Sequence, residues 1–243
     1  MVLKETGEFI GDCGLTMQLI NGVIRPEIGY HILKRLWRNG FGKEAAAACR
    51  NWAFGNTPFN RLYSYMKAEN IASQACAAAI GMDKVDEFTD AEGELSVAYA
   101  IDREKWRSLR LAGSEVWSEM LYSAKRVQSD RRLSPYVEAG CVAASVLASS
   151  GRVYTGICVD TCSTLGICAE RNAIFNMLTN FDDRIVKVLA LKPDGSCGAP
   201  CGACRELMVQ LSPDEYRQVE ILLDYETKRS TTLGQLTPEW WIG

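Results

Sequence analysis

The first half of the chain alternates between apolar stretches of strand length and longer segments rich in alanine. Apolar stretches flank Asn21–Gly22 and predict a β-hairpin, because this dipeptide tolerates the positive φ angles of a tight hairpin turn. A glycine-rich segment then opens an alanine-rich helix, and a second helix is predicted to begin after Asn70 and to stop at Gly81. The predicted strands are 8–20, 25–33, 61–67 and 95–101, the helices fall within 40–54 and 69–82, and 83–94 is a polar stretch.

The second half repeats strand and helix patterns in alternation, which favours an α/β layered domain. Two apolar stretches joined by Ser149–Ser150–Gly151 predict a strand pair. The predicted strands are 141–149, 152–159, 184–193 and 219–225, and the predicted helices are 114–126, 168–180 and 204–211. A charged segment near 103–113 separates the halves, as a linker or a connecting helix.

Composition and charge limit the classes of protein to which this chain can belong. The 47% hydrophobic and 23% charged residues of the 243-residue chain are ordinary for a soluble globular protein. A net charge of -3 argues against nucleic acid as a partner, because nucleic-acid binders carry a basic surface. No apolar run reaches the roughly 18 residues of a membrane span, and the polar first residues do not form a signal peptide. We therefore expect a cytoplasmic protein without a membrane partner.

The chain has 10 cysteines but only one histidine, His31. Three cysteines (Cys13, Cys49 and Cys76) lie in apolar or alanine-rich surroundings and are interpreted as core filler. The other seven fall between Cys141 and Cys204. With no secretory signal to favour disulfides, this cluster indicates metal binding, and any zinc site must consist mainly of thiolates.

The strongest chemical pattern is Cys168-Ala-Glu170 followed by Pro-Cys201-Gly-Ala-Cys204. Three protein ligands leave a fourth zinc position open for water and lower the pKa of that water. A carboxylate that is not a ligand can then carry protons between water and substrate, as hydrolytic deamination requires. We predict Cys168, Cys201 and Cys204 as zinc ligands and Glu170 as the catalytic residue. Both pairs are placed at helix starts, whose N–H groups offset thiolate charge.

Two alternatives compete with a catalytic zinc. One is a closed structural site in which Cys197, Cys162 or Cys158 supplies a fourth thiolate. The other is a redox role for the C-x-x-C sequence. The Cys-Ala-Glu triplet favours catalysis, because a structural zinc site has no use for the glutamate.

Residues 134–243 resemble the cytidine deaminase family through SPYVEAGCVAASVLASSGRVYTG, ICAERNAIF and APCGACRELM, in the family's order. The resemblance implies a five-stranded sheet between helices, with zinc between two helix N-termini. It also implies a homo-oligomer, a tetramer or a dimer, with active sites at subunit contacts and a small nucleoside as substrate.

The resemblance departs from the family at its ribose motif. Cys158 stands where the family has asparagine, and Asp160 where it has glutamate. The ending QLTPEWWIG is similar to the tail of blasticidin S deaminase, whose aromatic tail lies near the substrate, which implicates Trp240. Cys158, Asp160 and Trp240 are therefore the candidate substrate-binding residues, and the substrate need not be plain cytidine.

Residues 6–102 resemble the GNAT superfamily of N-acetyltransferases through GYHILKRLWRNGFGKEA and RLYSYMKAENIASQACAAAIGM. The family's first strand and first two helices have no counterpart. A helix N-terminus behind glycines can bind a pyrophosphate, so the loop is the candidate site for coenzyme A or acetyl-CoA. Its residues are Asn39, Gly40, Phe41, Gly42 and Lys43.

Together these patterns predict an α/β chain of two domains. A partial α+β acetyltransferase-like domain is expected over 1–105 and a three-layer α/β/α cytidine-deaminase-like zinc domain over 113–243. The leading hypothesis is zinc-dependent hydrolytic deamination of an aminopyrimidine nucleoside, which gives a uridine-like product and ammonia. The alternatives are a blasticidin-S-like nucleoside deaminase, an acetyl-CoA-dependent N-acetyltransferase with a non-catalytic zinc module, and a zinc-stabilised assembly protein.

Overall fold

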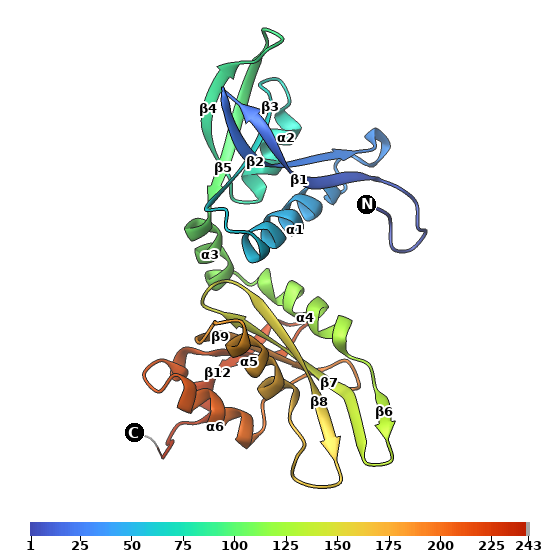
Figure 1. Ribbon diagram of the computed structural model, residues 1–243, viewed down its shortest axis with the longest axis vertical. Helices are drawn as coiled ribbons and strands as arrows, with labels where there is room; N and C mark the ends of the chain where they lie inside the picture. Colours follow the sequence, from blue (N-terminus) through green and yellow to red (C-terminus); the bar gives the residue numbers. More distant parts are fainter. Residues whose placement is uncertain (242–243) are drawn as a thin grey trace. The chain divides into compact units, whose positions relative to one another are not determined.

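A computed structural model describes residues 1–241 of the chain. Contacts divide the chain into two compact units, Met1–Leu109 and Arg110–Gly243, and each is described by itself. Both units are mixed α/β structures (Figure 1), as the sequence predicts. Among residues 1–241, no helix has both the length and the apolar content that a membrane span requires.

The first unit contains a five-stranded sheet in the order β1-β2-β3-β5-β4. Its first two strands form the predicted hairpin, in which Asn21 (φ 46°) and Gly22 (φ 74°) both take the left-handed conformation of a two-residue turn. Strands β2 and β3 are parallel and pair only at Glu27 and Tyr63. The strands are β1 (Gly11–Ile20), β2 (Val23–Ile32), β3 (Arg61–Lys67), β4 (Asp83–Thr89) and β5 (Leu95–Asp102).

Two helices, α1 (Phe41–Asn56) and α2 (Ile71–Ala79), pack against this sheet and enclose a core that includes Phe54, Leu62 and Trp106. The predicted ends of α2 are confirmed: the Asn70 side chain accepts a hydrogen bond from the Ser73 N–H, and Gly81 has a φ of 86°. A short 3-10 turn, η1 (Lys34–Leu36), precedes α1.

Strand β4 corrects the sequence analysis, which treated 83–94 only as a polar stretch. β4 is an edge strand with mostly exposed side chains, so its sequence lacks the apolar alternation from which strands are predicted. The charged segment that separates the two halves of the sequence is the helix α3 (Arg103–Ala112), which contains the division between the two units.

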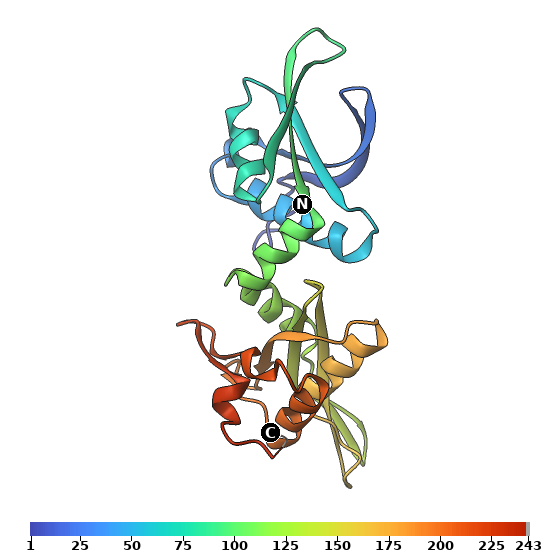
Figure 2. The ribbon, with the colours of Figure 1, turned by 90° about the vertical axis from the view of Figure 1, so that its left-hand side faces the viewer.

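The second unit is a three-layer α/β/α structure. Alternate residues of its strands face opposite layers: Ala144, Val146 and Val188 pack with α5 and α6, whereas Leu147 and Leu189 pack with α4. Strands β7 and β8 form a long hairpin in both views (Figure 1, Figure 2). The helices are α4 (Val116–Val127), α5 (Ala169–Thr179), α6 (Gly202–Leu211) and α7 (Leu233–Leu236), with the 3-10 turn η2 (Tyr216–Gln218). The strands are β6 (Arg131–Ser134), β7 (Val137–Ala148), β8 (Val153–Thr161), β9 (Ile185–Leu191), β10 (Cys197–Gly198), β11 (Glu220–Asp224) and β12 (Arg229–Thr232).

This sheet has seven strands where the resemblance implied five. Three of the seven, β6, β10 and β12, have only four, two and four residues, which is too short for an apolar pattern to reveal them. Gly156 of β8 determines how closely α5 approaches the sheet. A Cβ at this position would lie 2.2 Å from the backbone nitrogen of Ala173, so only glycine allows the first turns of α5 to lie against β8.

Candidate active site

Three cysteine thiols meet where helices α5 and α6 begin. Cys168 is the N-cap of α5 and Cys201 is the N-cap of α6, and both have extended backbone conformations. Cys204 lies one turn into α6 and is fully buried. The Sγ atoms of Cys168 and Cys201 are 3.4 Å apart, and those of Cys201 and Cys204 are 3.5 Å apart. We call Cys168, Cys201 and Cys204 the thiol trio.

The thiol trio fits a zinc ion. Zn–S bonds of about 2.3 Å in a tetrahedron separate sulfurs by about 3.8 Å, close to the distances between these thiols. Within residues 1–241, no fourth Cys, His, Asp or Glu ligand atom lies within 4.8 Å of all three sulfurs. The donor set therefore leaves one position of a tetrahedral ion for a water or a substrate, which is the arrangement of a catalytic site rather than of a structural one.

The surroundings of the trio bear differently on the pKa of each thiol. Burial raises the pKa of Cys204, and the negative charge of Glu170 adds to this effect. Burial also acts to raise the pKa of Cys201, but the backbone N–H groups of Cys204 and Ala203 and the neighbouring thiols bring it below its usual value. Burial and the neighbouring Cys201 thiol raise the pKa of Cys168, although the Arg171 guanidinium donates to its Sγ at 4.0 Å. Of the three thiols, only Cys201 therefore lies in surroundings that lower its pKa.

Glu170 is the second residue of α5 and has only 5% of its surface exposed. Its carboxylate is close enough to act electrostatically on Cys204, yet it is not part of the group of mutually close ligand atoms. Arg205, the residue after Cys204, donates to the carbonyls of Pro200 and Leu236. Glu170 is therefore a buried carboxylate beside the trio with no place in its ligand set.

The cysteines considered as a fourth ligand lie elsewhere. Cys197 is buried in the core that faces α4, and Cys162 is exposed and donates to the carbonyl of Tyr136. Cys158 belongs to a separate group with Cys141 and Asp160. The structure therefore offers no support for a closed four-cysteine site.

The structure places two of the candidate substrate-binding residues, Cys158 and Asp160, close together on β8. Cys158 is 6% exposed and lies in β8 against Cys141, whereas Asp160 is exposed on the same strand. Trp240 packs against the core that contains α5 and α6, and its buried Nε1 has no hydrogen-bond partner within residues 1–241. The tail considered with it includes residues 242 and 243, which lie outside the described residues.

The candidate coenzyme A loop forms the start of α1. Gly40 is the N-cap of this helix with a φ of 83°, a conformation that favours glycine. The Asn39 side chain donates to the carbonyls of Leu36 and Trp37, which holds the loop closed on itself. Phe41, Gly42 and Lys43 form the first turn, whose N–H groups have no helical acceptor.

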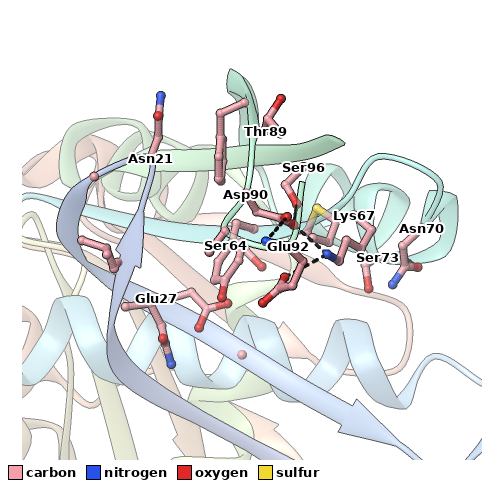
Figure 3. Close-up of a pocket in the computed structure, with 18 of the residues that line it drawn as sticks. Asn21, Glu27, Ser64, Lys67, Asn70, Ser73, Thr89, Asp90, Glu92 and Ser96 are labelled. Carbon is pink, nitrogen blue, oxygen red and sulfur yellow. Dashed lines mark hydrogen bonds and ion pairs between the residues drawn. The ribbon is translucent and has the colours of Figure 1, made fainter. Parts of the chain in front are cut away.

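A cavity of about 690 Å³ lies in the same unit, lined by residues of the first hairpin, β3, α2 and the turn between β4 and β5 (Figure 3). None of the five loop residues is among those that line it. At one side of the cavity Lys67 forms ion pairs with Asp90 and Glu92. The hydrogen bond from Lys67 holds the pKa of Asp90 at about 2.

Glu27 is a cavity residue that the sequence analysis did not identify. Its carboxylate is 8% exposed and accepts a hydrogen bond from Thr16, and burial raises its pKa above the usual value. It lies where β2 and β3 pair for only one residue. A carboxylate between Pro26 and Ile28 in a predicted strand was the available signal.

Two family models match the chain, one in each half. The Acetyltransferase (GNAT) domain matches residues 1–83, and the cytidine and deoxycytidylate deaminase zinc-binding region matches residues 117–218. These matches confirm both resemblances drawn from the sequence.

Individual proteins match each half separately. The chain is 31% identical over 99 residues to the cytidine deaminase of Mycobacterium tuberculosis (strain H37Rv), which is 40% of this chain and 70% of that protein. It is 40% identical over 79 residues to the uncharacterized protein YkkB of Bacillus subtilis (strain 168), which is 32% of this chain and 46% of YkkB. The chain thus spans about half the length of YkkB. The crystal structure of cytidine deaminase from Mycobacterium tuberculosis is 25% identical, with a TM-score of 0.42, over 51% of this chain and 96% of that one.

Proposed function

The chain belongs to the cytidine deaminase family through its C-terminal half, and on this premise we propose that this half catalyses zinc-dependent hydrolytic deamination of an aminopyrimidine nucleoside. One observation carries the proposal: three thiols converge at two helix starts with a buried carboxylate beside them and no fourth ligand within residues 1–241. A structural zinc site would have no role for Glu170.

In this mechanism the thiol trio holds the metal and Glu170 moves the protons. Zinc, when bound, acts as a Lewis acid that lowers the pKa of a water molecule toward neutrality. Glu170 accepts a proton from the attacking water and passes it to the ring nitrogen. It then takes the remaining proton from the hydroxyl that has added to the ring carbon and transfers it to the amino group, which leaves as ammonia while that hydroxyl oxygen becomes the carbonyl of the product. The Arg171 guanidinium, close to Cys168, offsets thiolate charge.

We further propose that the substrate differs from plain cytidine in its non-base part. The Cys158 thiol lies against Cys141 and accepts the Val142 N–H, so little of it is free to contact a ribose hydroxyl. A thiol is also a weak donor and acceptor compared with an asparagine amide. The indole N–H of Trp240, which has no hydrogen-bond partner in the part of the chain that the structure describes, is a candidate donor to such a substrate, as in a blasticidin-S-like nucleoside.

We also propose that the protein acts as a homo-oligomer, a dimer or a tetramer. Tyr136 and Leu165 are 70% and 83% exposed on loops at the ends of β7 and β8. Large apolar side chains gathered in such loops are favourable contacts for a second copy. Light scattering of the full chain measures the assembly directly.

The test is ammonia release from cytidine, deoxycytidine, cytosine and blasticidin S by the zinc-loaded full chain. At least one substrate should release ammonia, and Glu170→Gln should lower turnover by at least ~10²-fold while zinc content stays constant. Glu215→Gln is the matched control, because Glu215 is paired with Arg184 on the surface. Loss of zinc in Glu170→Gln, or unchanged turnover, would contradict the role given to Glu170.

Acetyl transfer by the N-terminal half is a second candidate, favoured by the buried Glu27 in the cavity of Figure 3. Acetyl-CoA, when bound, supplies the acetyl group to an acceptor amine. Glu27, whose pKa is raised by burial, is suited to accept the proton that the amine loses. Release of free thiol from acetyl-CoA with primary amines tests this activity. Glu27→Gln should abolish the release, and Glu87→Gln, an exposed carboxylate on β4, should not.

A further inference from the structure

A second group of ligand-type side chains lies on the hairpin of β7 and β8. Cys158 and Asp160 are two residues apart on β8 and therefore point to the same face of the sheet. The pairing of β7 with β8 is irregular between Ala139 and Ala143, and Cys141 lies within this irregular stretch. The irregularity turns the Cys141 thiol toward Cys158. We call Cys141, Cys158 and Asp160 the strand group.

The atoms of the strand group are close enough to share one ion. The two Sγ atoms are 3.3 Å apart, and each sulfur lies within 4.8 Å of an Asp160 carboxylate oxygen. Sulfurs on a tetrahedral zinc are separated by about 3.8 Å, so a small rotation of one thiol suffices. The Val142 N–H donates to the Cys158 sulfur at 3.3 Å, which favours a negatively charged sulfur at this position.

Negative charge accumulates around the strand group. Glu138 of β7 is the direct cross-strand partner of Asp160, and like charges in this position destabilise a sheet. Arg132 of β6 is the register partner of Glu138 on its other side, and its guanidinium donates to the carbonyls of Ser134 and Pro135. A divalent cation between the thiols and Asp160 would relieve the repulsion between the two carboxylates.

We propose that the strand group is a second metal site, which binds a thiophilic divalent cation of the zinc class. Two sulfurs and one carboxylate supply three ligands, and the exposed position of Asp160 leaves the fourth to water. The site shares no residue with the thiol trio. The inference therefore stands whether or not the C-terminal unit is a deaminase.

The experiment counts zinc on the full chain, purified with a phosphine reductant, equilibrated with zinc and desalted. The wild-type chain should hold about two zinc ions, and Cys158→Ser and Cys204→Ala should each hold about one, because each variant removes a ligand from a different site. Cys197→Ser is the matched control, since it removes a buried thiol that belongs to neither group. It should keep both ions.

A second variant tests the strand group as a metal site if Cys158→Ser fails to fold. Asp160→Asn changes an exposed side chain, so circular dichroism should be unchanged while the weaker-bound zinc loses at least about tenfold in affinity, as measured against a chelating dye. About one zinc per wild-type chain in excess zinc would overturn the proposal. So would a zinc affinity unchanged in Asp160→Asn, or a Cys141–Cys158 disulfide in the reductant-treated protein.

Discussion

The ten cysteines of this chain are used differently in its two units. In the first unit Cys13, Cys49 and Cys76 come from β1, α1 and α2 and pack against the apolar core. In the second unit, cysteines form both groups of mutually close ligand atoms found among residues 1–241. The difference is one of backbone position. Helix starts and a strand irregularity bring thiols together with a carboxylate, whereas the thiols on the sides of β1, α1 and α2 lie against the apolar core, where Cys13 and Cys49 contact each other.

The two groups of the second unit also differ from each other. The thiol trio lies at helix N-termini, whose N–H groups stabilise thiolates without any added side chain. The strand group has one such N–H, from Val142, and lies among carboxylates. A cation should therefore bind the trio more tightly than it binds the strand group.

The largest effect should come from Cys204→Ala. Cys204 is fully buried and is the only member of the trio inside α6, so its loss removes a ligand and leaves a void in the core. Deaminase activity should fall at least ~10³-fold, since metal activation of water contributes several kcal/mol to catalysis. Zinc content, turnover and thermal unfolding are the measurements. Cys197→Ala is the control, because it also removes a buried sulfur, and this variant should keep its zinc. An active Cys204→Ala chain would show that the trio is not the catalytic centre.

A smaller effect concerns thiol reactivity in the first unit. A hydrogen bond from Cys13 lowers the pKa of Cys49 against the effect of burial, whereas the same hydrogen bond, with burial, raises the pKa of Cys13. The thiolate is the reactive form, so Cys49 should be alkylated by iodoacetamide at a lower pH than an ordinary thiol of pKa about 8.5.

Mass spectrometry of peptides alkylated at a series of pH values measures this difference. At neutral pH Cys49 should react at least about threefold faster than Cys13 or Cys76, whose pKa values are raised. Cys13→Ser weakens the hydrogen bond, so it should move the alkylation midpoint of Cys49 upward in pH. An unchanged midpoint would show that the two thiols do not interact.

The features that could be predicted from the sequence are local ones. The spacing of Cys201 and Cys204 within one helical turn, and of Cys168 and Glu170 at a helix start, follows from residues close in the chain. The α/β fold class and the turn at Asn21–Gly22 were predictable for the same reason. The ligand assignments themselves stay predictions until zinc is measured.

The features that could not be predicted depend on distant parts of the chain. The contact of Cys141 with Cys158 depends on a register irregularity between two strands, which no spacing along one strand reveals. Strand β4 lies at the edge of its sheet because it pairs with β5 alone, and β5 pairs with β3 through its opposite edge. This strand order does not follow from the sequence of β4. Glu27 becomes a cavity residue through the divergence of β2 and β3, which the sequence of β2 alone does not contain.

The smallest effect should come from Cys76→Ala, which tests whether the cysteines of the first unit are filler. Cys76 is partly buried beside Tyr30, and its sulfur lies near Gly42. Replacing it removes one sulfur at a partly exposed site, so the free energy of unfolding should fall by less than about 1.5 kcal/mol. Zinc content and ammonia release should not change. Urea unfolding of the zinc-loaded chain gives the first quantity, and loss of zinc or a much larger destabilisation would show that Cys76 does more than fill space.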